Sequence, residues 1–340
     1  MSDTNDTVEE EEEFYSGSDL ALSISARFWL YLVPNVLSIL CSFFVLYYLL
    51  FDRTRRQALN NHVFIVLLFI GLLFELIDIP LTLHYYRFGD SWQLTPSVSL
   101  FWTYIDFALY TTQIIIFAWA TIERHILTFK FQWLSTKKKR FFIHYLPLIT
   151  LIIYIFIYCC FIIYFPPCEN SYYHSYINGV PIPCVIEKTI IGKLDLICHQ
   201  IIPTFIIVIF SIALGIRILY EKNRLNQLIQ WRKQRKIAIQ LLNTSMLYFF
   251  FNFPWTVIDL SYEIGLSIDY IIRVRSYAYY FSCYIIFLFP FVYCGSLSGF
   301  RKKLKKFLCC QRNRRVIPLQ PLPMKHVRRT RFDQNGRIIY

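Results

Sequence analysis

Residues 142–165 have the sequence FIHYLPLITLIIYIFIYCCFIIYF, a run of 24 residues without Asp, Glu, Lys or Arg. An α-helix needs about 20 mainly apolar residues to cross the hydrocarbon core of a bilayer. The stretch Phe142–Phe165 therefore predicts a membrane-spanning helix.

Six other runs along the chain have the length and the apolar character of a spanning helix. They are Phe28–Phe51, Val63–Tyr86, Val98–Thr121, Leu194–Tyr220, Ile237–Leu260 and Ser276–Tyr293. The last run is somewhat short and Ile237–Leu260 contains a proline, but packing against neighbouring helices compensates for both. Because no internal repeat is evident, the sequence predicts an all-α membrane protein with one seven-helix bundle.

The composition supports a membrane protein and argues against a nucleic-acid-binding one. Hydrophobic residues make up 56% of the chain and charged residues only 17%, whereas a soluble domain carries about 25% charged residues. The formal net charge is +13, but the positive residues lie in short segments between the apolar runs. That distribution indicates a membrane orientation signal, and we expect no binding to nucleic acid.

The basic residues also predict which way the spans run. Lys and Arg gather in loops on the cytosolic side of spanning helices. The segments after the first, third, fifth and seventh runs are rich in them, including Arg53, Arg55, Arg56, the run Lys137–Arg140, Lys233–Lys236 and Arg301–Lys306. The alternate loops hold few: Arg87, Lys188, Lys193, Arg273 and Arg275. We therefore expect an extracellular N-terminus, a cytosolic C-terminus and a location in the plasma membrane.

The N-terminal segment, residues 1–26, is expected to lie outside the cell. Met1–Asp19 is acidic and lacks the basic region and apolar stretch of a cleaved signal peptide. The first apolar run is then the uncleaved insertion signal. Asn5 begins an Asn-Asp-Thr triplet, which is an acceptor for glycosylation on the outer side.

Four cysteines lie where they are expected to be modified. Cys168 and Cys184 share the predicted outer loop between the fourth and fifth spans, where the environment is oxidising. We expect them to pair; the alternative is that one bonds elsewhere or stays free. Cys309 and Cys310 follow a basic amphipathic stretch beyond the last span, so they are expected palmitoylation sites.

Three local motifs then narrow the class of membrane protein. Ala120–His125 has the sequence ATIERH at the inner end of the third span, and Phe289–Tyr293 has the sequence FPFVY at the inner end of the seventh. Phe300–Phe307, with the sequence FRKKLKKF, follows directly. In this order and at these places, the motifs resemble those of the rhodopsin-like (class A) G-protein-coupled receptors. Pro203 and Pro254 also lie where that family has prolines.

The resemblance implies a fold with a short amphipathic eighth helix on the inner membrane face. It extends from the first span to Cys310. The seven-helix receptor domain then covers residues 27–308, and residues 309–340 form a basic cytoplasmic tail. Pro318, Pro321 and Pro323 lie among arginines there, so we expect the tail to be disordered.

The resemblance also implies a signalling role for the residues of these motifs. An Arg at membrane depth is costly, so it needs a partner or water. Glu123 would neutralise Arg124 in a resting state, and spreading of the helices would release Arg124 toward a heterotrimeric G protein. The expected activation switch comprises Glu123, Arg124, His125, Pro254, Pro290 and Tyr293. The alternative is a boundary Arg that extends to the interface.

The chain departs from the family pattern at several positions, which marks it as a divergent member. Ser99 stands where the family has the disulfide-forming Cys of the third helix, and Asn252 where it has the Trp of the sixth. Gly71 and Phe289 replace residues of the family's sodium site, so we expect no sodium ion there. Ser211 replaces the Tyr that pairs with the motif Arg.

Asp106 is the main ligand-binding candidate. It precedes Arg124 by 18 residues, which is five helical turns, so both residues face the same way about 27 Å apart. By the resemblance, Asp106 matches the Asp that receptors for biogenic amines pair with a ligand ammonium. Two alternatives remain: Asp106 bonds to neighbouring Tyr or Trp residues, or the ligand is a peptide.

Further ligand candidates lie in the outer halves of other spans: Asp195, His199, Trp255 and Asp259. Carboxylates inside spans are functional candidates. Together with the acidic N-terminus they make the outer face negative. An extracellular basic peptide or cationic small molecule is therefore the favoured partner besides the membrane lipid.

Other functions fit the sequence less well. Ser276–Tyr293 contains no Lys to carry retinal. The histidines show no metal-ligand spacing, so we expect no metal, no cofactor and no enzyme. The alternative to a receptor is a seven-helix transporter, or a receptor-like scaffold that does not couple to G proteins.

Overall fold

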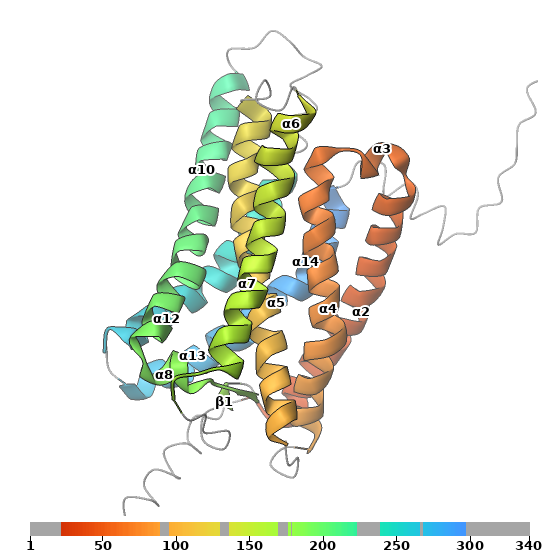
Figure 1. Cartoon of the computed structure of the whole chain (residues 1–340). Coiled ribbons are helices and arrows are strands. Elements are labelled where there is room, and N and C mark those ends of the chain that lie inside the picture. The colour runs from red at the N-terminus through yellow and green to blue at the C-terminus, as the bar shows by residue number, and fades with distance from the viewer. Residues whose placement is uncertain are drawn as a thin grey trace, which may run out of the picture. The chain divides into compact units, whose positions relative to one another are not determined.

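The structure confirms an all-α architecture. The computed structural model describes residues 22–88, 95–129, 136–168, 176–177, 179–222, 239–265 and 268–296. Almost all of these residues are helical, and the long helices lie side by side in a bundle (Figure 1).

The first three long helices are continuous. They are α2 (Ile24–Phe51), α4 (Leu59–Phe88) and α5 (Pro96–Phe129), with the short α3 (Arg53–Arg56) between the first two. The hydroxyl of Ser23 caps α2 by accepting from Ala26 N at 3.2 Å. α5 contacts α4, α7 and α10, so it runs through the middle of the bundle (Figure 1).

The remaining helices are built from shorter pieces. They are α6 (Lys137–Arg140), η3 (Phe141–Tyr145) and α7 (Leu146–Tyr164); α8 (Cys184–Lys188), α9 (Ile190–Asp195), η4 (Leu196–Ile201) and α10 (Ile202–Lys222); η5 (Tyr248–Asn252) and α12 (Phe253–Glu263); and α13 (Ile268–Ser282) and α14 (Tyr284–Ser296). The segments η3, η4 and η5 are π-helical.

Six helical segments in the described part of the chain are long and apolar enough to cross a membrane. They are Ile24–Phe51, Asn61–Phe88, Pro96–Leu127, Lys137–Tyr164, Ile190–Arg217 and Val274–Ser296. These segments correspond to the first five predicted spans and to the seventh. The chain is therefore a multi-pass membrane protein.

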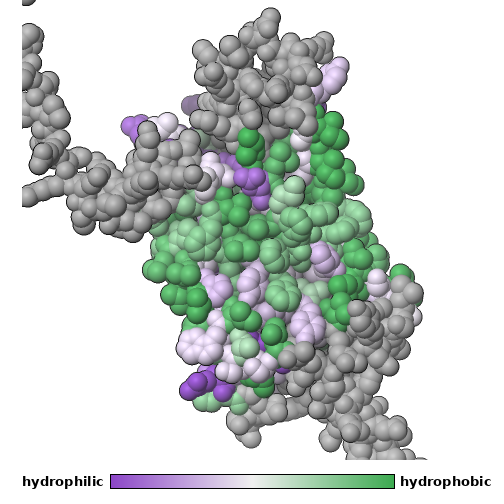
Figure 2. All heavy atoms as spheres, turned by 180° about the vertical axis from the view of Figure 1, so that it is seen from behind, coloured by the Kyte–Doolittle hydropathy of each residue, from purple (hydrophilic) through white to green (hydrophobic). Residues whose placement is uncertain are grey.

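The surface of the bundle also has the character of a membrane protein. Large apolar side chains stand out from its sides: Leu40 is 63% exposed, Phe161 64% and Phe250 65%. Figure 2 shows apolar side chains across the middle of one face, with most hydrophilic ones toward its two ends. A soluble monomer rarely exposes so large an apolar area, whereas lipid covers it without cost.

The predicted sixth span, Ile237–Leu260, is not among the described segments that are both long and apolar enough to cross a membrane. The chain is helical from residue 239 through η5 and α12 to Glu263. Gln240, Asn243 and Asn252 lie within this segment and lower its mean hydropathy. It is long enough to cross a bilayer, but its composition alone does not identify it as a span, so seven spans remain a prediction.

Each π-helical segment ends two residues before a proline. Tyr145 precedes Pro147, Ile201 precedes Pro203, and Asn252 precedes Pro254. A proline lacks an N–H group, and its ring clashes with the carbonyl four residues earlier in an α-helix. The wider π turn accommodates the proline without ending the helix.

The last predicted span is interrupted. α13 and α14 are separated at Cys283, although the sequence predicts one helix over Ser276–Tyr293. The hydroxyl of Ser282 donates to the carbonyl of Tyr279 at 2.8 Å. This bond competes with the backbone bond that would continue the helix, an effect known for serine inside helices.

A short hairpin and a disulfide close one end of the bundle. β1 (Tyr176–Ile177) pairs antiparallel with β2 (Val180–Pro181), and the carbonyl of Pro181 accepts from the hydroxyl of Thr103 at 3.1 Å. Cys168 and Cys184 form a disulfide, which confirms the predicted pair. We call this end of the bundle the hairpin end, and the opposite end, which carries Glu123 and Arg124, the Arg124 end.

Removing the disulfide should lower the thermal stability of the protein. Closing a loop of about 15 residues contributes about 3 kcal/mol. We expect the double variant Cys168→Ala/Cys184→Ala to unfold several degrees below the wild type when both are heated in detergent micelles. Cys198→Ala removes an exposed free thiol and serves as the control. An unchanged unfolding temperature of the double variant would contradict a stabilising bridge.

Candidate functional site

A cavity of about 140 Å³ lies among the helices at the hairpin end. Its walls come from α5, β2, α8, α9, η4, α12 and α13. All five predicted ligand-binding residues line it: Asp106, Asp195, His199, Trp255 and Asp259. These residues lie on four different elements, so the fold brings together side chains that are far apart in the sequence. Their binding of a ligand remains a prediction.

Asp106 lies buried in the wall of the cavity, with 4% of its surface exposed. The hydroxyl of Tyr279 lies 3.0 and 3.1 Å from its two oxygens and donates to the carboxyl group. Within the described ranges, no Lys, Arg or His forms an ion pair with Asp106. A carboxylate can accept about four hydrogen bonds, so a cation in the cavity would find an acceptor there.

A smaller hollow of about 10 Å³ lies beside the cavity, bordered by Asp78, Asp106 and Cys283. Asp78 is buried and accepts from the indole N–H of Trp102 at 2.9 Å. A space of this size accommodates about one water molecule. The hollow thus places a second buried carboxyl group next to Asp106.

A second wall carries the pair formed by Asp195 and His199. His199 Nδ1 lies 2.8 Å from Asp195 Oδ1, and the hydroxyl of Tyr154 lies 3.0 Å from His199 Nε2. A carboxylate can only accept, so Nδ1 carries the proton. The bond to Asp195 thereby fixes the tautomer and the direction of the ring.

A third wall carries the pair formed by Asp259 and Arg275. Arg275 Nε donates to Asp259 Oδ1 at 2.7 Å. The guanidinium lies 4.4 Å from the ring centre of Tyr262 and 5.8 Å from that of Trp255. The ion pair and both rings hold the Arg275 side chain in place.

Below the cavity, Asn252 joins several helices. Its Oδ1 accepts from the hydroxyl of Tyr110 at 3.0 Å and from the amide of Gln200 at 3.2 Å. Its own amide donates to Thr204 at 2.7 Å. Asn252 is the last residue of η5 and is fully buried. These bonds connect η5 to α5, η4 and α10 directly beneath the cavity.

The Arg124 end contains a second polar network. Glu123 is hydrogen-bonded to Nδ1 of the buried His144. His144 Nε2 lies 3.1 Å from His62 Nδ1, and His62 Nε2 donates to the carbonyl of Arg56 at 2.7 Å. The chain of contacts connects α5 to η3, α4 and α3. The sequence predicted Arg124 as the partner of Glu123 and gave no role to either histidine.

The other predicted switch residues lie around this network. Arg124 is buried, with its guanidinium 5.2 Å from the ring centre of Phe64. His125 Nε2 lies 2.8 Å from the carbonyl of Phe210 on α10. Pro254 is the second residue of α12, which follows η5, and Pro290 lies inside α14.

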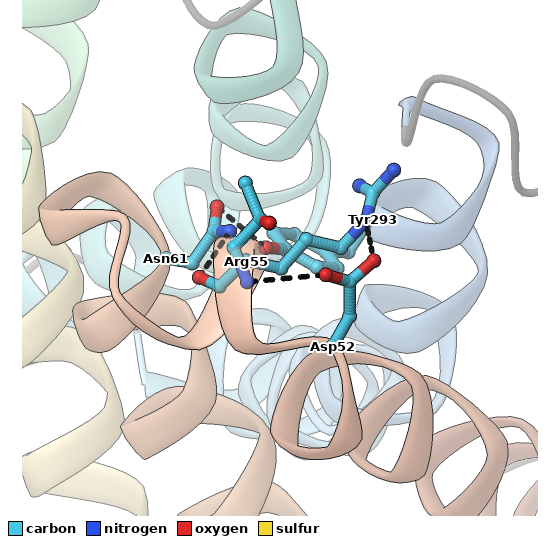
Figure 3. Close-up of polar contacts among 5 residues, drawn as sticks. Asp52, Arg55, Asn61 and Tyr293 are labelled. Atoms are coloured by element: carbon cyan, nitrogen blue, oxygen red, sulfur yellow. Dashed lines mark hydrogen bonds and ion pairs between the residues drawn. The ribbon is translucent and has the colours of Figure 1, made fainter.

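Tyr293, from the predicted motif of the last span, is tied to α4 and α3. Figure 3 shows its hydroxyl near Asn61, at 3.5 Å from Oδ1. The amide of Asn61 donates to the carbonyl of Arg55 at 3.0 Å, and Arg55 Nε donates to Asp52 at 3.3 Å. The end of α14 thus contacts α4 at Asn61, and Asn61 is in turn bonded to α3.

The position at which the family pattern has a sodium-binding Asp has a different environment. A Cβ atom at Gly71 would lie 3.6 Å from the amide of Gln113. Gln113 is buried, and its amide has no hydrogen-bond partner in the part of the chain that the structure describes. Among the described residues, no group of three or more His, Cys, Asp or Glu side chains could hold a metal ion.

Several predicted sites lie outside the described residues. These are Asn5, the amphipathic segment Phe300–Phe307, Cys309 and Cys310. Conversely, the sequence did not single out Tyr110, Arg275 and Tyr279 as site residues. The sequence identified candidate site residues as polar or charged side chains within an apolar run. Tyr and Arg near the ends of spans are too common to identify a site in this way.

Comparison with known proteins gives no further assignment. No protein-family model matches the chain, and no curated protein matches it. The functional argument therefore depends on the cavity and on the network at the Arg124 end.

We expect Asn252→Ala to destabilise the bundle. It removes the shared partner of Tyr110, Thr204 and Gln200, and a buried polar group without a partner costs about 1–3 kcal/mol. Heating the purified variant in detergent should give an unfolding temperature several degrees below that of the wild type. Ser261→Ala removes an exposed hydroxyl bonded only within its own helix and should change little. Equal unfolding temperatures for Asn252→Ala and the wild type would show that the junction contributes no stability.

Proposed function

We propose that the protein is a divergent receptor of the rhodopsin-like type, which transmits binding of an extracellular ligand to a heterotrimeric G protein. The observation that carries the proposal is the arrangement along α5. Asp106 faces a cavity at the hairpin end, and Glu123 and Arg124 lie buried in a polar network at the other end. The two sites are 18 residues apart on one continuous helix, about 27 Å.

The proposal includes seven spans. Residues 239–263 form a helical segment long enough to cross a bilayer, and its polar residues are those that join the other helices. Buried polar side chains are the expected exception to apolar composition in a spanning helix, because they face the bundle interior. This segment is the sixth span in the proposal.

The ligand in this proposal is a cationic small molecule or a peptide with a basic group. Asp106 has a neutral hydrogen-bond donor and no ion-pair partner among the described residues. Its charge in the cavity favours a ligand that brings a counter-charge. Asp195 and Glu263 also line the cavity, and Glu263 pairs with Lys193 there.

The proposed switch at the Arg124 end has two arrangements. In one, Glu123 bonds to His144 and Tyr293 contacts Asn61, so that α5, η3, α4 and α14 are held together. In the other, these contacts open and Arg124 becomes accessible to the G protein. A ligand drives such a change only by binding one arrangement more tightly. The transporter or scaffold alternative lacks this role for Arg124.

The signalling assay compares wild type with Arg124→Ala in cells, using amines and basic peptides as stimuli. We expect an agonist response in the wild type that falls at least tenfold in Arg124→Ala at equal surface expression. Arg53→Ala changes an exposed arginine at the same end and should leave the response intact. Absence of any G-protein activation by the wild type, with the same basal signal in Arg124→Ala, would favour the non-coupling alternative.

The proposed orientation in the plasma membrane has its own test. With the N-terminus outside, Asn5 receives a glycan, and an antibody to an N-terminal epitope binds intact cells. Asn5→Gln should remove the mass that an endoglycosidase removes from the wild type. Staining of the N-terminal epitope only after permeabilisation would contradict the orientation. The disulfide at the hairpin end agrees with an extracellular environment for that end.

A further inference from the structure

Arg275 is a cation held in the wall of the cavity. Its Nε donates to Asp259, and the rings of Tyr262 and Trp255 lie against its guanidinium. A guanidinium has five N–H donors in a planar fork. The bond to Asp259 uses the one on Nε, and within the ranges that the structure describes no other residue hydrogen-bonds to this side chain. The terminal amino groups therefore remain for an anion in the cavity.

Arg275 and the partner of Asp106 lie on the same face of α13. Tyr279 follows Arg275 by four residues, so their side chains are neighbours on the helix surface. The hydroxyl of Tyr279 binds Asp106. Arg275 thus lies about one helical turn (~6 Å of rise) along α13 from Tyr279, the residue that binds Asp106.

An aromatic surface connects the two charged groups. The ring centre of Trp255 lies 5.2 Å from that of Tyr279 and 5.8 Å from the Arg275 guanidinium. Phe107 and Tyr110 also line the cavity. An apolar or aromatic part of a ligand would pack here, with a charged group at either end.

From this arrangement we infer that the cavity takes a zwitterionic small molecule. Its ammonium group binds Asp106, its carboxylate binds the terminal amino groups of Arg275, and a short apolar spacer lies against Trp255. Arg275 already has Asp259 as its counter-charge, but a ligand with only a cation leaves the terminal amino groups of Arg275 without a partner. A ligand with only an anion meets Asp106 and Asp195. The inference rests on the proposed function for the identity of the cavity as the ligand site, and it narrows the ligand class.

Binding to purified full-length protein in lipid nanodiscs tests this inference without any G protein. The zwitterionic probes are γ-aminobutyrate and ε-aminocaproate. Butylamine and hexylamine lack the anion, and butyrate and caproate lack the cation. A hydrogen bond to a charged group is worth about 1.5–3 kcal/mol, so at least one zwitterion should bind roughly tenfold to 100-fold more tightly than its one-charge counterparts.

Variants test whether the preference for zwitterions over amines depends on Arg275 and whether binding depends on Asp106. Arg275→Gln/Asp259→Asn removes both charges of the ion pair and leaves no unpaired charge behind. It should abolish the advantage of the zwitterion over the amine, without weakening the amine. Asp106→Asn should weaken zwitterion and amine alike. Lys193→Gln removes an exposed cation that pairs with Glu263 near the cavity, and it should preserve the advantage.

The outcomes separate this inference from the proposed function. Equal affinity of amines and zwitterions for the wild type, an advantage that survives in the double variant, or no binding by any probe would each overturn the inference. In those cases the Arg124→Ala assay still decides the receptor proposal. Binding of a zwitterion that depends on Arg275, in a protein that activates no G protein, would keep the ligand class and overturn the receptor.

Discussion

Polar side chains inside an apolar shell must find their partners within the bundle, and this requirement organises the interior. In hydrocarbon, an unsatisfied polar group costs several kcal/mol. Several such groups on α5 bond to other elements, among them Asp106 to Tyr279, Tyr110 to Asn252, and Glu123 to His144. These bonds hold the central helix to α13, η5 and η3 at three depths. The same side chains form the cavity and the network at the Arg124 end, so stability and the proposed signalling depend on one set of contacts.

The sequence predicts the fold well where the physical requirement is local. The length of an apolar run decides whether a helix can cross a bilayer, and this located six helical segments. The pairing of Cys168 with Cys184 also follows from their place in one loop. The break at Cys283 and the π turns do not follow, because they depend on which hydrogen bonds the backbone loses to prolines and to Ser282. Whether residues 239–263 span the membrane is ambiguous from the sequence. The polar residues by which this segment bonds to other helices also lower the mean hydropathy of the segment.

The candidate site could be predicted in its residue types and not in its pairings. Charged or aromatic residues at similar depth identified Asp106, Asp195, His199, Trp255 and Asp259, and the fold brings all five to one cavity. Their partners come from parts of the sequence without a distinctive signal. Tyr279, Arg275 and His144 are ordinary residues until the helices are packed. The sequence predicted Arg124 as the partner of Glu123, and the structure adds His144 on η3 as a hydrogen-bond partner that the sequence did not indicate.

The three π turns have a consequence for how the length of these helices can vary. A π turn holds one residue more than an α turn, and each residue of an α-helix adds 1.5 Å of rise and about 100° of rotation. Removing one residue from η5 (Tyr248–Asn252) would convert the turn to α-helical hydrogen bonding. The side chains on both flanks would then keep the faces that they present to the bundle. A single-residue deletion at one of these turns, just before Pro147, Pro203 or Pro254, would therefore preserve the contacts on both flanks but restore the proline clash that the π turn relieves. Elsewhere in the same helices, a deletion would rotate every contact beyond it.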